Sequence, residues 1–478
     1  MTLARTTQLI AALLLRRFMN RMRFGLNRKG AVVAGTGFCV RLVRDGLVTA
    51  TGAYIGKRGS SKLATTSRNF LPAGIVGKDM RLLLRDRNFL VQTLVMPVLM
   101  VCFQLFNAGG AQFICSSFQS AATFAYGLGA YVLISTALSI LAVEGNSLWM
   151  LFALPVPLYR VMLRKTLLWA CCALAYTVVA LALWASRIRS FHPIDLVHCT
   201  MACAGVFIYA FIAAGIGMLG TDPLETEVKR RVGPGTAYLY LILASMFGYA
   251  LHAPSMWTRV GQLVLSTLLA YALWQKVRDR SPFLLDPVSA PPPQISLADG
   301  LIAALAFFVL QGIALLIALW WKLAMGPAIT VAFSVAGCLV VFFTCLVYWR
   351  TPWVLVVHTF TGRKSFLQSI GSGVLFGLAA GGFGLVYLEA LQRLPLLQQL
   401  RKEAVQLHDV HGLWLALLAV VAAPMFEEFI FRGLVFRGLR RSLPLGVSVF
   451  GSAAIFALCH PPISAFPVFI MASLGLEL

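Results

Sequence analysis

The segment Glu427-Glu428-Phe429-Ile430-Phe431-Arg432 places two acids and one base inside an apolar run. Residues 411–425 before it are almost all apolar, and the apolar run 445–459 after it is followed by His460. A charged side chain at the centre of a membrane-spanning helix costs roughly 2.5 to 3.5 kcal/mol on insertion scales, so such residues are functional candidates. The segment therefore predicts both a membrane-spanning helix and a site on it.

The composition of the whole chain is that of a helical membrane protein. Of its 478 residues 59% are hydrophobic and only 12% are charged, and the mean hydropathy is +0.82. These values exclude an ordinary soluble domain. The apolar runs have the roughly 20 residues that a helix needs to cross about 30 Å of hydrocarbon. We expect an all-α, polytopic membrane protein with about eleven to twelve transmembrane helices in two bundles.

The predicted spans follow one another along the chain after a basic N-terminal segment. They are residues 90–107, 119–143, 166–186, 200–220, 235–253, 256–275, 298–321, 328–349, 366–387, 409–433 and 444–461, with a twelfth beginning near Ile463.

The formal charge of +23 is distributed as membrane topology requires, which argues against a nucleic-acid partner. Residues 1–89 hold 17 Lys and Arg and three acids, and further basic clusters fall in alternate predicted loops. This alternation places the N-terminus in the cytoplasm, with Arg187 and Arg189 as exceptions. We expect a multi-pass protein of the cell membrane, in the bacterial inner membrane, with the lipid bilayer as its partner. The clusters are Arg160, Arg164 and Lys165; Lys229, Arg230 and Arg231; Lys276, Arg278 and Arg280; and Arg437, Arg440 and Arg441.

The chain divides at a proline-rich stretch that contains Pro282, Pro287 and Pro291-Pro292-Pro293. Proline interrupts helices and favours an extended spacer. We therefore expect a basic cytoplasmic segment 1–68, a transmembrane domain 69–280, a linker 281–297 and a second transmembrane domain 298–478. The ten cysteines are scattered, which favours apolar packing over disulfides or zinc sites.

The first transmembrane domain carries two local signals. Lys78 to Arg87 is a basic amphipathic segment that leads into the first span, and Glu144 to Trp149 follows the second. This order resembles the permease subunits of ABC-type exporters, in which a surface helix precedes the first span and a coupling segment meets a separate ATPase. The resemblance implies such an ATPase as a partner. Alternatively, the two segments only anchor the helices in their orientation across the membrane and have no role in transport.

In the second domain, the acids and the base differ in the faces they occupy. Glu428 and Arg432 lie four residues apart on a helix, so they share a face and can form an ion pair. Glu427 is rotated by about 100° from Glu428 and points elsewhere. One carboxylate is thus neutralised, while Glu427 remains free to act on a water molecule.

Helix geometry brings His460 back toward Glu427. The rise from Glu427 to a turn near Gly438 is roughly 16 Å, and from Pro444 to His460 it is roughly 24 Å. Helix tilt and an irregular turn can absorb the difference of about 8 Å. Phe456, four residues before His460, shares its face and can pack beside it.

These residues resemble the motifs of the CAAX-protease and bacteriocin-processing intramembrane protease family. Its EExxxR motif matches Glu427, Glu428 and Arg432, and its FxxxH motif matches Phe456 and His460. The resemblance implies an endopeptidase that cleaves a membrane-associated peptide or protein with water activated by Glu427. It makes Glu428 and Arg432 a structural pair, and it gives His460 either an oxyanion role or a share, with Glu427, in a metal such as zinc.

A further family motif, HxxxN or HxxxD, has no match after His460, since residues 461–478 contain no His, Asn or Asp. We therefore expect the chain to be truncated and to be a poor or inactive protease. Other readings stay open: an exporter permease with an accessory C-terminal half, a catalytically dead scaffold, or an interfacial helix end in which these charges face headgroups. His408 and His411 are weaker metal candidates that we expect to be interfacial.

Overall fold

The computed structural model describes residues 91–106, 116–152, 156–186, 192–222, 231–285, 294–348, 378–379, 381–387 and 412–475, with a few isolated residues between them. Residues Thr93–Leu478 form one compact unit, apart from the residues before it. Several predicted features therefore lie outside the described residues. They are the basic segment 1–68, the amphipathic segment 78–87, most of the span 366–387, and His408 and His411.

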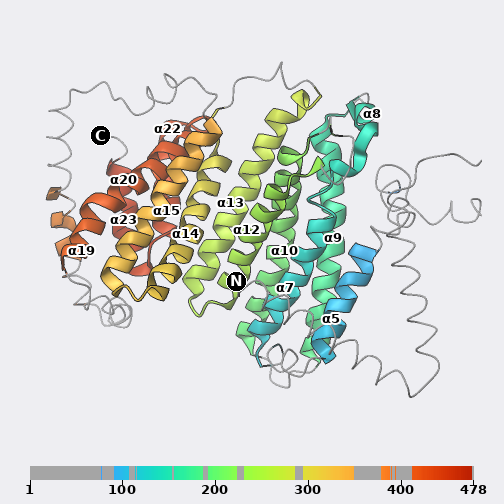
Figure 1. Ribbon diagram of the computed structural model, residues 1–478, viewed down its shortest axis with the longest axis horizontal. Helices are drawn as coiled ribbons and strands as arrows, with labels where there is room; N and C mark the ends of the chain where they lie inside the picture. The colour runs from blue at the N-terminus through green and yellow to red at the C-terminus, as the bar shows by residue number, and fades with distance from the viewer. Residues whose placement is uncertain are drawn as a thin grey trace, which may run out of the picture. The chain divides into compact units, whose positions relative to one another are not determined.

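Helices make up the first part of the unit Thr93–Leu478 (Figure 1). A short π-helical turn η2, Val91–Val95, leads into the first of them. A 3-10 segment η3, Ala142–Ser147, and the short helix α8, Leu148–Phe152, connect the second and third long helices. The longer helices are α5 (Met96–Phe106), α7 (Phe118–Ser135), α9 (Leu158–Ala185), α10 (Pro193–Gly220), α12 (Pro234–His252) and α13 (Met256–Arg280).

The second part of this unit begins with a hairpin of two long helices, α14 and α15, and ends with the segments that carry the acids and His460. Figure 1 shows these elements in orange and red beside α13, and α13 packs against α14. The elements are α14 (Leu297–Trp320), α15 (Met325–Tyr348), α19 (Gly412–Leu417), η8 (Leu418–Ala422), α20 (Ala423–Glu427), η9 (Glu428–Phe436), α21 (Arg437–Arg440), α22 (Leu445–Leu458) and α23 (Pro462–Gly475).

The all-α, polytopic fold expected from the composition is confirmed. Among the described helices, α9, α10, α12, α14 and α15 are long and apolar enough to cross a membrane. The predicted starts of two spans were wrong, because α9 begins at Leu158 rather than near 166, and α10 begins at Pro193 rather than near 200. In both cases polar residues continue the helix beyond its apolar stretch, which a search for apolar runs does not detect.

Two of these helices begin at capping boxes that the sequence encodes. At the start of α10, Pro193 follows the cap residue His192, and the Asp195 carboxylate accepts the His192 backbone N–H at 2.7 Å. At the start of α14, the Asp299 carboxylate accepts the Ser296 backbone N–H at 3.0 Å. Such caps satisfy N–H groups that have no partner within the helix.

The prediction that Lys165 lies in a basic loop is wrong. Lys165 lies in the second turn of α9 and forms an ion pair with Glu144 of η3, with both side chains almost fully buried. Arg231 donates to the Ala142 carbonyl at 3.1 Å and is also buried. A lysine buried in this way needs a carboxylate partner, because an isolated buried charge is too costly.

Basic clusters assigned to one side of the membrane do lie together. The Arg278 guanidinium at the end of α13 lies 5.5 Å from the ring centroid of Tyr159, at the start of α9. Arg441, after α21, lies 3.5 Å from the Asp279 carboxylate. Three basic segments that the positive-inside pattern places in the cytoplasm therefore meet at one end of the helices.

Glycines let the acid-bearing segment approach α14 closely. A Cβ on Gly300 of α14 would lie 2.8 Å from the Cα of Val435, which belongs to η9. A Cβ on Gly438 of α21 would overlap the backbone of Leu297. Small residues allow such contact between membrane helices. The position of η9 therefore depends on the absence of side chains at these two residues.

We predict that Gly300→Ala destabilises the protein by about 1 to 3 kcal/mol, as overpacking does, although alanine favours helix. Gly446→Ala is the matched control, because among the described atoms none lies within 4 Å of a Cβ placed at Gly446. Thermal unfolding in detergent should show a lower midpoint for Gly300→Ala and an equal or higher one for Gly446→Ala. Equal midpoints for the two variants would contradict the proposed close contact.

Candidate functional site

The segment that carries the acids is not the regular α-helix that the spacing argument assumed. Glu427 ends α20, and Glu428 begins the π-helical stretch η9, which runs to Phe436. A second π-helical stretch, η8, precedes α20. Wide turns of this kind are rare and occur frequently at functional sites. The backbone dihedral angles at Glu427 and Glu428 nevertheless stay in the α-helical range, so the predicted rotation of about 100° between the two acids stays a prediction.

Pro424 explains the first of these wide turns. It has no N–H to donate to the carbonyl four residues earlier, and its ring crowds that carbonyl. The Ala423 N–H donates to the Leu418 carbonyl, five residues back. The proline thus loosens the helix directly before the acids, within an otherwise apolar span.

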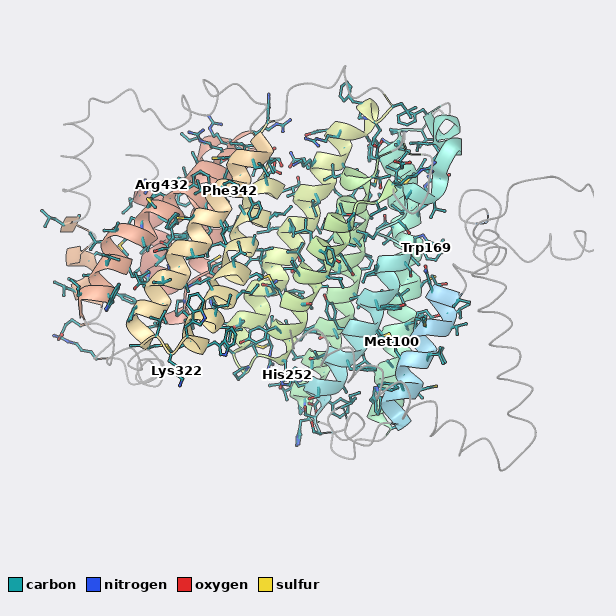
Figure 2. All side chains as sticks on the ribbon, viewed as in Figure 1. Met100, Trp169, His252, Lys322, Phe342 and Arg432 are labelled. Carbon is teal, nitrogen blue, oxygen red and sulfur yellow. The ribbon has the colours of Figure 1, made fainter. Side chains whose placement is uncertain are left out.

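One cavity of about 290 Å³ brings the four predicted residues together. Glu427, Glu428 and Arg432 line it from α20 and η9, and His460 lines it from the end of α22. Apolar side chains complete the lining. They are Pro424, Phe431, Ala453, Phe456, Val468, Met471 and Ala472, with Ser452 as a further polar member. Figure 2 marks Arg432 on the ribbon of this part of the chain.

The ion pair predicted from the four-residue spacing is present. The Arg432 Nε lies 2.7 Å from a Glu428 carboxylate oxygen, and the two side chains are 41% and 50% exposed. Both line the cavity. In this pair the positive charge of Arg432 compensates the negative charge of Glu428 on an otherwise apolar helix. Glu427 is the second carboxylate that lines the cavity.

His460 is held by its own helix. Its backbone N–H donates to the Ala457 carbonyl at 3.1 Å, and its ring Nδ1 lies 2.9 Å from the Phe456 carbonyl oxygen. A carbonyl only accepts hydrogen bonds, so Nδ1 carries the proton and, in the neutral ring, Nε2 keeps its lone pair. A neutral His460 can therefore accept a proton or bind a metal through Nε2, whereas it donates from Nε2 only as an imidazolium.

Aromatic packing joins the two motifs. The Phe456 ring lies 4.6 Å from the Phe431 ring and 4.6 Å from the His460 ring, the latter in an edge-to-face arrangement. The predicted contact between Phe456 and His460 is thus confirmed. The Ser452 hydroxyl donates to the Phe431 carbonyl at 3.2 Å, between α22 and η9. These contacts hold the imidazole beside the acid-bearing helix.

The donor set does not suffice for a catalytic zinc. Such zinc sites take three protein ligands, whereas within the described ranges no group of three His, Cys, Asp or Glu side chains is placed to hold a metal. At this cavity the carboxylate and imidazole donors are Glu427, His460 and Glu428, and Glu428 is held in the ion pair with Arg432. We derive no step through a metal.

Several residues at the site carried no signal in the sequence. Ser452 and the α23 residues Val468, Met471 and Ala472 line the cavity but belong to neither motif. Trp257 of α13 donates its indole N–H to the His460 carbonyl at 3.1 Å, across 203 positions of the chain. No local pattern could have connected residues so far apart. To predict this bond, one would have had to know that the start of α13 lies beside the end of α22.

Comparison with known families agrees with the motifs. Residues 409–478 match the family model described as type II CAAX prenyl endopeptidase Rce1-like. This segment is Rce1-like. It contains all four predicted site residues, from Glu427 to His460. By sequence this segment is thus similar to the Rce1-like CAAX proteases, as the EExxxR and FxxxH motifs had indicated.

The first transmembrane domain also has a family match. Residues 47–277 match a family described as membrane protein of 12 TMs, a description that names no exporter and no transported solute. No curated protein and no solved structure matches the chain. The matched ranges begin at 47 and 409, and the expected domain boundaries at 69 and 298 stay predictions.

We predict that Arg432→Met destabilises the protein more than Glu428→Gln/Arg432→Met does. The single change leaves a carboxylate without its partner on an apolar helix, whereas the double change removes both charges. In a double-mutant cycle on thermal unfolding, we expect a coupling energy of about 1 kcal/mol or more.

Glu389 and Arg393 provide the matched control. They form the same four-residue pair at 3.2 Å, but with side chains 58% and 78% exposed. An exposed pair typically contributes about 0.2 to 1 kcal/mol, so its cycle should give the smaller coupling. Equal coupling energies for the two pairs would mean that Arg432 is an ordinary surface partner.

Proposed function

We propose that the protein is an intramembrane endopeptidase of the CAAX-protease type, which cleaves a membrane-associated peptide or protein. The single observation that carries the proposal is the cavity that Glu427, Glu428, Arg432 and His460 line together. Charged groups gathered on facing membrane helices are costly, and such groups generally serve chemistry or transport. The Rce1-like match over the same residues supports the hydrolytic reading.

Glu427 is the proposed general base. It accepts a proton from a water molecule as the water oxygen bonds to the scissile carbonyl carbon, and it then delivers that proton to the departing amine nitrogen. Arg432 holds Glu428 in an ion pair, so the neighbouring carboxylate is compensated and Glu427 is the acid left for proton transfer.

His460 is the proposed second catalytic group. With Nδ1 bonded to the Phe456 carbonyl, its Nε2 is the ring atom available to the cavity. In its imidazolium form it would donate from Nε2 to the oxyanion that forms at the attacked carbonyl. The apolar remainder of the lining would accept the apolar part of a membrane-anchored substrate.

We expect slow cleavage by the wild-type chain, because residues 461–478 hold no match to the HxxxN motif. Against that rate, we predict that Glu427→Ala lowers peptide-bond cleavage further, by up to the roughly 100-fold to 10,000-fold that a positioned general base usually contributes. His460→Ala should also lower the rate substantially. The two losses should not add, because residues that act as a unit are strongly non-additive. The measurement is cleavage of a membrane-anchored peptide library by the purified protein in proteoliposomes.

Glu389→Ala is the control for this experiment, since Glu389 is an exposed carboxylate outside the cavity lining. It should cleave at the wild-type rate. Turnover by Glu427→Ala at the wild-type rate would remove the proposed base, and turnover unaffected by either site substitution would point to a contaminating protease.

A second candidate is an exporter permease whose protease-like domain is accessory. One feature favours it: the segment η3–α8 after α7 is fixed by the buried Lys165–Glu144 pair and by Arg231. A segment that transmits force from an ATPase must be rigidly attached to the membrane helices. On this candidate, the partner would be a separate ABC ATPase, and the proposed location in the bacterial inner membrane would place that ATPase in the cytoplasm.

We predict that Lys165→Met destabilises the protein by about 3 to 5 kcal/mol, because it leaves the buried Glu144 carboxylate without its lysine partner. Lys165→Met combined with Glu144→Gln should recover most of that loss. Thermal unfolding in detergent measures both variants. If the single and double variants are equally unstable, the buried pair does not hold this segment.

A further inference from the structure

A helix outside the Rce1-like segment reaches the candidate site. Trp257 lies in the first turn of α13, within the range that matches the 12-TM family. Its indole Nε1–H donates to the backbone carbonyl of His460 at 3.1 Å. The two domains therefore meet at the residue proposed to stabilise the oxyanion.

The contact is one of two hydrogen bonds that α13 makes with residues 442–460, the segment that contains α22, and the two bonds follow in antiparallel order. At the other end of α13, Gln275 Nε2 donates to the Ser442 hydroxyl at 2.5 Å. Trp257 and Gln275 are 18 positions apart, and so are their partners Ser442 and His460, in the opposite direction along the chain. At about 1.5 Å per residue, the separation along α13 corresponds to roughly 27 Å.

Gly261 gives a third point in the same antiparallel order. A Cβ built on it would lie 3.7 Å from the Leu458 carbonyl oxygen, one turn of α13 beyond Trp257. The backbone of α13 thus passes close to the end of α22. The Trp257 bond therefore has a second close approach beside it, at Gly261.

The His460 carbonyl needs a donor from elsewhere in the protein. Pro461 and Pro462, which follow it, have no N–H. The Ser464 N–H, which a continuing α-helix would direct at this carbonyl, donates to the Pro461 carbonyl at 2.9 Å. A carbonyl without a partner is costly inside a membrane, so the Trp257 indole supplies a bond that this helix end lacks.

This bond completes the anchoring of His460. The backbone N–H and Nδ1 are bound to α22 through the Ala457 and Phe456 carbonyls. The carbonyl is bound to α13 through Trp257. Both peptide groups flanking the His460 Cα are thus fixed, and so is the direction of Nε2 relative to the cavity.

We infer that Trp257 is a positioning residue for the hydrolytic site: its indole N–H fixes the His460 backbone, so the first transmembrane domain completes the site of the second. This role rests on the proposed protease function. A displacement of about 1 Å at a catalytic group can cost up to 100-fold in rate, so a bond that holds this backbone affects turnover without contacting the substrate.

Trp257→Phe tests the role, because it keeps an aromatic ring and removes the N–H. Its matched control is Trp274→Phe on the same helix, since the buried Trp274 Nε1 has no hydrogen-bond partner among the described residues. In proteoliposomes, kcat for peptide cleavage should fall about ten-fold in Trp257→Phe with KM unchanged, and both should stay at wild-type values in Trp274→Phe. Equal kinetics for the two variants would overturn the assignment.

A readout that needs no turnover separates this role from the protease function. Nitrogen-15 spectra of histidine-labelled protein report the protonated ring nitrogen, and His460→Gln identifies the His460 signals. Trp257→Phe should shift or broaden these signals and Trp274→Phe should not. If the wild type cleaves nothing, the protease proposal fails while this spectrum still decides the positioning role. Unchanged His460 signals in Trp257→Phe would refute it.

If Trp257→Phe does not accumulate, Gly261→Leu perturbs the same contact and leaves Trp257 intact. The leucine would press on the end of α22, whereas Gly261→Ala fits at the ordinary contact distance of 3.7 Å. Gly261→Leu should reproduce the change in the His460 signals, and Gly261→Ala should not. Identical spectra for these two variants would likewise overturn the proposal.

Discussion

Inside a membrane, every charge and every backbone polar group must find its partner within the protein, and the structure depends on this constraint. Glu428 is paired with Arg432, and Lys165 is paired with Glu144. The His460 carbonyl, next to two prolines, receives the Trp257 indole. Each of these bonds satisfies polar groups that would be costly to bury in hydrocarbon without a partner. The Lys165–Glu144 and Trp257–His460 bonds also join separate segments of the chain.

Close helix contact places these groups at one cavity. Gly300 and Gly438 bring η9 and α21 against α14, and Phe431 and Phe456 pack η9 against α22. Pro424 loosens the helix turn directly before the acids. A rigid frame thus surrounds a locally irregular helix. This arrangement suits a site that must hold fixed charges and still expose one carboxylate to water.

The helical class was predictable, and so were the five described helices that are long and apolar enough to cross a membrane, because a run of about 20 apolar residues forms a helix in a bilayer. The Glu428–Arg432 pair and the Phe456–His460 contact followed from helical spacing. The starts of α9 and α10 did not, since polar residues extend both helices.

Two further features were also beyond local spacing. The π-helical stretches before and after Glu427 interrupt the regular α-helix that the spacing argument assumed. The pairing of Lys165 with Glu144 and of Trp257 with His460 depends on which helices become neighbours. A single sequence shows which residues share a face of each helix, but it does not show which helices pack against one another.

The central claim is that Glu427 and His460 face each other across one cavity, and cross-linking in the native membrane tests it most directly. In a cysteine-free background, Glu427→Cys/His460→Cys would be treated with a short bifunctional thiol reagent. Met425→Cys/His460→Cys serves as the control, because Met425 is 56% exposed and does not line the cavity. The account predicts rapid cross-linking of the 427–460 pair and little of the 425–460 pair. Cross-linking of the two pairs at equal rates would contradict it.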